Sequence, residues 1–135
     1  MPEAVSSQRS AINGGGMQDF RHLKVWEKAH RMTLDIFQAT RKFPRQELYG
    51  LSSQIRRACM SIPANISEGC GRRGDRDFAR FLQIAMASAC ETEYYLILAR
   101  DLGFLEPPLY VKLTSQVTEV KRMLVSLLVK LRAEG

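Results

Sequence analysis

Six arginines gather around a glycine-rich break near the middle of the chain. Guanidinium groups bind phosphate oxygens through paired hydrogen bonds, so such a cluster is suited to a nucleic-acid backbone. No aromatic residues alternate with these arginines and no helix-turn-helix spacing occurs, so base-specific recognition is not indicated. The alternative is an ordinary solvated basic surface. The predicted nucleic-acid-binding residues are Arg56, Arg57, Arg72, Arg73, Arg76 and Arg80.

A second group of polar residues precedes the break. Pro63 has no backbone N–H to bond the carbonyl of Cys59, so another donor must satisfy that oxygen. A buried carboxylate without partners would be strongly disfavoured, which makes a polar network around the proline physically sensible. The alternative is a ligand or partner site built from the same groups. The residues expected in this network are Asn65, Glu68, Glu91 and a nearby arginine such as Arg57.

The chain lacks the arrangements that support common enzyme chemistry. Its only histidines, His22 and His30, are eight residues apart, so they point about 80° apart on a helix. No H-E-x-x-H or C-x-x-C motif occurs, and no G-K-[ST] follows the glycines. The serines have no neighbouring histidine to activate them. We therefore expect no catalytic residue, no metal site and no cofactor, and we predict that the protein is not an enzyme.

Composition places limits on the remaining possibilities. The 135 residues suit one domain, and a hydrophobic content of 45% supports a real core. The formal charge of +6 favours anionic partners without identifying one. No apolar run approaches the ~20 residues that span a bilayer, so we expect a cytoplasmic protein that does not bind membranes. Three cysteines without close spacing are expected to be reduced thiols, with Cys59 and Cys90 packed in helices.

Four segments with one apolar face each must position these groups. The spacing predicts helices over 23–42, from Pro44 to the glycine break, from Asp75 as N-cap to Leu102, and from about 109 to 131. Short connections between such long helices favour an all-α, antiparallel, up-down-up-down four-helix bundle over residues 19–135. Residues 1–18, with the triple glycine Gly14 to Gly16, are expected to form a flexible, disordered N-terminal arm.

The last two predicted helices carry more apolar residues than one core needs. A bundle has a single inside, so a second apolar face is best explained by packing between subunits. We therefore predict a homo-oligomer. The residues outside the main stripes are Tyr94, Tyr95, Ile97, Val111, Val125 and Val129.

Several stretches together resemble the four-helix-bundle proteins encoded in intervening sequences of bacterial 23S ribosomal RNA genes. They are DFRHLKVWEKA (19–29), FPRQELYGLSSQIRRACMSIPANISEG (43–69), FARFLQIAMASACETEYYL (78–96) and DLGFL (101–105). The resemblance covers nearly all of 20–131 and implies a left-handed bundle that assembles as a homopentamer. It also carries the polar motif onto Asn65, Glu68, Gly69 and Arg72, without attaching a chemistry to it.

A more distant likeness is to the accessory proteins of diversity-generating retroelements, which are basic pentameric bundles that associate with a reverse transcriptase and nucleic acid. The sequence thus predicts a non-enzymatic, homo-oligomeric bundle, pentameric by resemblance. Its repeated basic surface would bind RNA, another nucleic acid or a nucleic-acid-processing protein without base specificity. The alternative is an oligomeric protein–protein scaffold with no direct nucleic-acid binding.

Overall fold

The computed structural model describes residues 19–134, and these residues are all-helical, with four long helices and no strand. The predicted all-α class is therefore confirmed. The arm predicted over 1–18 lies outside the described residues. No described helix is both long and apolar enough to cross a membrane. The elements are η1 (Phe20–His22), α2 (Lys24–Thr40), η2 (Arg45–Glu47), α3 (Leu51–Cys70), α4 (Asp75–Asp101) and α5 (Pro107–Glu134).

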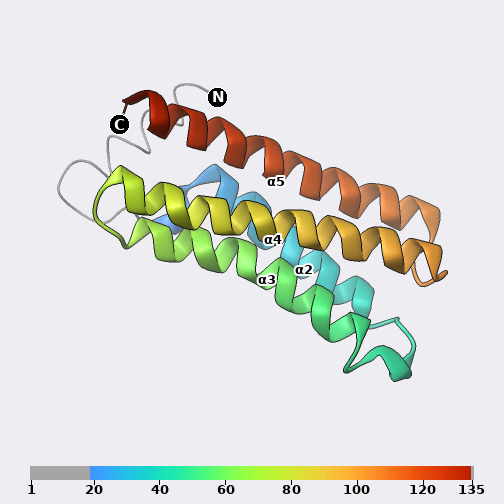
Figure 1. Cartoon of the computed structure of the whole chain (residues 1–135). Coiled ribbons are helices and arrows are strands. Elements are labelled where there is room, and N and C mark those ends of the chain that lie inside the picture. Colours follow the sequence, from blue (N-terminus) through green and yellow to red (C-terminus); the bar gives the residue numbers. More distant parts are fainter. Residues whose placement is uncertain (1–18, 135) are drawn as a thin grey trace.

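The four helices pack side by side, each against two others. α3 contacts α2 and α4, and α5 completes the bundle by contacting α4 and α2. Figure 1 shows the chain reversing direction at each connection, so the end of α5 lies at the same end of the bundle as the link between α3 and α4. The left-handed sense of the bundle stays a prediction.

The core is a continuous apolar column to which every helix contributes one stripe. Met32 and Ile36 of α2 and Ile55 and Ile62 of α3 belong to this column, and all four side chains are fully buried. Helices α4 and α5 complete the column with residues at three- and four-residue spacing. Those residues are Phe78, Leu82, Ala85, Ala89, Leu96, Leu113, Val117, Val120, Leu124 and Leu131.

The second predicted helix begins later than its apolar pattern indicated. Pro44 has an extended backbone and is followed by the single 3-10 turn η2, and α3 starts only at Leu51. Leu48, which the pattern placed in the stripe, is 46% exposed. Glu47 explains the delay, because its Oε1 accepts a hydrogen bond of 3.3 Å from the backbone N–H of Leu51 and so satisfies one free donor at the helix start.

The start of α4 also differs from the prediction. Gly74 is the N-cap, with a φ of 84° that favours glycine, and Asp75 is the first helical residue. Asp75 and Asp77 both lie in the first turn, where carboxylates interact favourably with the helix dipole. The aspartate thus stabilises the helix from inside its first turn instead of capping it.

Gly69 lets α3 and α4 approach closely next to their connection. A Cβ atom at this position would lie 2.9 Å from Cδ1 of Phe78 and 3.0 Å from Cβ of Phe81. Both phenylalanines are buried, so neither ring can swing away at low cost. The predicted polar motif thus includes Gly69 for a packing reason: any side chain would push the two helices apart.

We predict that Gly69→Ala destabilises the protein by about 1–3 kcal/mol through overpacking, although alanine is intrinsically the better helix former. The measurement is the free energy of unfolding in urea. The matched control is the exposed Ala64 on the same helix, where Ala64→Gly should destabilise by about 1 kcal/mol through helix propensity alone. If the alanine variant were more stable than the glycine variant at both position 69 and position 64, the result would contradict the close approach of α3 and α4 at Gly69.

Candidate nucleic-acid interface

Asn65 forms a polar contact within α3 and, through one serine, with α4. Its Nδ2 donates to the carbonyl oxygen of Ser61 at 2.8 Å and to the Ser61 hydroxyl at 2.9 Å. The Ser88 hydroxyl of α4 donates to the Ser61 hydroxyl oxygen at 2.8 Å, across the interface between the two helices. All three side chains are half-buried, so the contact satisfies groups that have lost water and fixes α3 relative to α4.

The other members of the predicted network bond elsewhere. Glu68 accepts a hydrogen bond from Arg72 Nη2 at 2.8 Å, and Glu91 accepts one from Tyr95 Oη at 3.0 Å, which raises the pKa of Tyr95. Both carboxylates are exposed. Glu68 therefore bonds a residue of the connection after α3, and Glu91 bonds one turn along α4. Neither joins Asn65, so the network expected around Pro63 is corrected: of its predicted acidic and amide members, only Asn65 links α3 to α4.

A threonine of α2 lies beside the carbonyl that Pro63 leaves without its helical donor, and its single hydroxyl proton is shared between that oxygen and one in its own helix. Thr33 Oγ1 lies 3.2 Å from the oxygen of Cys59 and 2.8 Å from that of Ala29 in its own helix. Thr33 is buried, so water does not replace this contact. The proline thus makes α3 depend on a polar side chain of α2, which sequence spacing could not pair with it.

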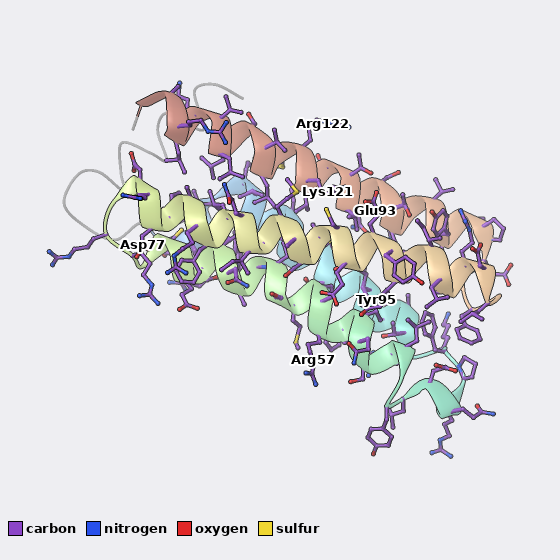
Figure 2. The ribbon with its side chains drawn as sticks, in the orientation of Figure 1. Arg57, Asp77, Glu93, Tyr95, Lys121 and Arg122 are labelled. Atoms are coloured by element: carbon purple, nitrogen blue, oxygen red, sulfur yellow. The ribbon has the colours of Figure 1, made fainter. Side chains whose placement is uncertain are left out.

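The six predicted arginines occupy three separate places. Arg56 turns inward: its Nε donates to Thr40 Oγ1 at 2.8 Å, and its Cζ lies 5.2 Å from the centre of the Phe37 ring. Arg57 is exposed on α3, about 20 Å along the helix from its end. Figure 2 shows it far from Asp77, which marks the start of α4. The remaining four form the elbow cluster: Arg72 and Arg73 in the connection, and Arg76 and Arg80 at the start of α4.

Two arginines of the elbow cluster form cation–π contacts and ion pairs with neighbouring residues of the chain. The Cζ atoms of Arg72 and Arg80 lie 4.9 Å and 4.5 Å from the centre of the Phe81 ring. Arg72 also pairs with Glu68, and Arg80 Nε lies 3.3 Å from Asp77 Oδ1. Cation–π contact and ion pairing orient both groups, and the carboxylates offset much of their charge.

Arg73 and Arg76 are the available cations of the elbow cluster. Both are exposed, and no ion pair joins either to another residue of the described chain. Arg76 also lines a groove of about 510 Å³ between α4 and α5, together with Arg132. Sequence reasoning missed Arg132 because it is more than fifty residues further along the chain. The predicted antiparallel order of the helices could have indicated that Arg132 lies near Arg76, because it places the end of the last helix beside the start of the third.

The three cysteines of the chain lie in two different environments, buried and exposed. Cys59 and Cys70 are buried, and burial raises the pKa of each thiol to about 12, with the charge of Asp19 adding to the shift at Cys70. Both therefore stay protonated and weakly nucleophilic near neutral pH. Cys90 was expected to be packed but is exposed. Within residues 19–134, no three His, Cys, Asp or Glu side chains are grouped to hold a metal ion.

Comparison with known proteins supports the resemblance found in the sequence. A family model described as 23S rRNA-intervening sequence protein matches residues 21–126. A crystal structure from Bacteroides thetaiotaomicron, described as a protein of unknown function from the S23 ribosomal protein family, superposes with a TM-score of 0.70 at 29% identity. The match covers 77% of this chain and 97% of that one. No curated protein matches the chain significantly.

We predict that Thr33→Val destabilises the protein by about 1–3 kcal/mol, because a buried carbonyl oxygen loses its donor while the side-chain volume is kept. The measurement is a double-mutant cycle in urea with Pro63→Ala, which restores a backbone N–H for the Cys59 carbonyl. Thr33→Val should be clearly less destabilising in that background. An equal effect in both backgrounds would show that Thr33 does not compensate for the proline.

Proposed function

We propose a function from one premise: this chain belongs to the 23S rRNA-intervening sequence protein family. The protein is a non-enzymatic, cytoplasmic, homo-oligomeric bundle, and it binds RNA or a nucleoprotein partner through the elbow cluster. The observation that carries this proposal is the pair of exposed guanidinium groups of Arg73 and Arg76, which form no ion pair within residues 19–134, beside the oriented Arg72 and Arg80. Such groups bind phosphates without reading bases.

Assembly strengthens this weak site by repeating it. A few phosphate contacts on one subunit give low affinity, whereas several linked copies bind a long polyanion together. The proposed homopentamer therefore presents one elbow cluster per subunit to the same RNA. A nucleic-acid-processing protein that carries RNA is a compatible partner.

The outer face of α5 supports the oligomer. Val111, Val125 and Val129 are each at least half exposed, and they lie within about 40° of one another around the helix. Ser115 and Thr118 continue the stripe, whose one charged member, Arg122, projects from α5 away from the other helices in Figure 2. A long stripe of small, mostly uncharged side chains is typical of a surface that packs against another helix.

For the RNA interaction, we predict that replacing Arg72, Arg73, Arg76 and Arg80 with Ala abolishes retention of structured RNA at low salt. Wild-type retention should fall steeply as salt rises, because binding releases counterions. The measurement is filter retention of a labelled RNA hairpin across a salt series. The matched control replaces four exposed arginines away from the elbow, Arg31, Arg41, Arg45 and Arg57, and changes the net charge equally.

The control variant should keep most of the retention. Equal loss in both variants would mean that net charge alone attracts RNA, and unchanged retention in the elbow variant would refute the site. A wild-type protein that retains no RNA even at low salt would instead favour the protein–protein scaffold.

For the oligomer, we predict that Val125→Asp with Val129→Asp lowers the mass measured by light scattering from that of the oligomer to the 15.3 kDa of one chain. Burying two carboxylates against an apolar partner surface is strongly unfavourable. Leu34→Asp, at an exposed leucine of α2, is the matched control and should leave the mass unchanged. A monomeric wild-type protein at micromolar concentration would refute the assembly.

A further inference from the structure

We propose that the groove between α4 and α5, beside the elbow cluster, binds a single unpaired nucleotide of the RNA, with its base inside and its phosphate at the rim. This inference rests on the proposed function and deepens it, because it names the form of RNA that the protein prefers. Figure 1 shows why the groove lies there: the end of α5 runs beside the start of α4.

The bottom of the groove is apolar and large enough for a base. Its volume of about 510 Å³ lies in the range of small-molecule sites. Leu131 is buried, and Leu128 and Ala79 are half-buried, so these three side chains form the base of the groove. Aliphatic surface of this kind accepts the flat face of a base, and the small Ala79 leaves the space that a larger residue would fill.

Two cations stand at the rim, one from each helix. Arg76 of α4 and Arg132 of α5 both line the groove and are exposed. Within the described part of the chain, neither forms an ion pair. Guanidinium groups on both sides of an opening can hold one phosphate through several charge-assisted hydrogen bonds. The groove thus combines anion binding at its edge with apolar burial below.

The remaining lining residues favour a nucleotide over a simpler anion. Asp75 also lines the groove, and its carboxylate weakens the attraction of the two arginines for any anion, so charge alone does not make this a strong phosphate site. The exposed Gln83 offers both a donor and an acceptor. A nucleotide supplies a phosphate, a flat base and hydrogen-bond donors within one residue.

The geometry also distinguishes unpaired from paired RNA. In a duplex the bases are stacked inside the helix, so only the phosphates and riboses reach a protein groove. A single strand, loop or bulge can turn one base out and place it in the groove. The elbow cluster binds the phosphates of either form, whereas the groove adds affinity for unpaired nucleotides only.

The test compares binding of a labelled oligouridylate and of an RNA duplex of equal length to the full chain, measured by fluorescence anisotropy. Ala79→Met fills the groove without changing charge. We expect it to weaken oligouridylate binding about fivefold, the order of magnitude for losing the apolar contact area of one base, and to leave duplex binding unchanged. Arg73→Gln, outside the groove, should weaken both.

Arg132→Gln provides a second variant at an exposed position near the end of α5, where the fold tolerates substitution. It should reduce the slope of log affinity against log salt by about 0.7 for oligouridylate, the value for one phosphate contact of a single strand, and leave the duplex slope unchanged. Thermal unfolding of each variant checks that the bundle is intact.

The outcomes separate the two proposals. Wild-type binding to both RNAs that neither Ala79→Met nor Arg132→Gln changes would overturn the groove site and leave the elbow cluster standing. An altered mass of Ala79→Met in light scattering, with RNA binding unchanged, would overturn it too and assign the groove to a contact between subunits. Failure of the wild-type protein to bind either RNA would refute the proposed function itself.

Discussion

The close packing of α3 against α4 next to their connection is the constraint on which the rest of the structure depends. Gly69 has no room for a side chain beneath Phe78 and Phe81, and the Ser61–Ser88 hydrogen bond joins the same two helices further along. Only four residues, 71–74, connect the helices, so the chain must reverse within a very short distance. Gly74 makes this possible with its positive φ.

The same packing determines which arginines are available to a partner. Phe81 is buried, and its ring contacts two guanidinium groups that also pair with carboxylates three or four residues away. Arg73 and Arg76 are left without such partners in the described chain. The number of arginines in the sequence therefore overstates the charge that a phosphate backbone would meet, because ion pairing within the protein offsets part of it.

The fold was largely predictable because each helix carries one long apolar stripe, and four such stripes have few ways to bury themselves. The predicted starts of α3 and α4 were wrong, because local interactions determine where each helix begins. α3 begins only at Leu51, whose N–H donates to Glu47, so Leu48 lies outside the helix. Gly74 takes the capping position expected for Asp75. The candidate site was less predictable. The four-residue spacing of Glu68 and Arg72 suits the ion pair that they form, but spacing alone could not show that Arg56 would bond Thr40.

By itself, the sequence determined the helical class, the glycine break, the family and the need for a donor at the Cys59 carbonyl, because these follow from periodicity, from glycine and proline chemistry and from extended motifs. Only the tertiary structure decided that Thr33 supplies that donor and that Arg132 stands beside Arg76 at one groove. The physical reason is that both pairings join residues far apart in the chain. Their contact depends on the rotation and stagger of whole helices, which local spacing does not encode.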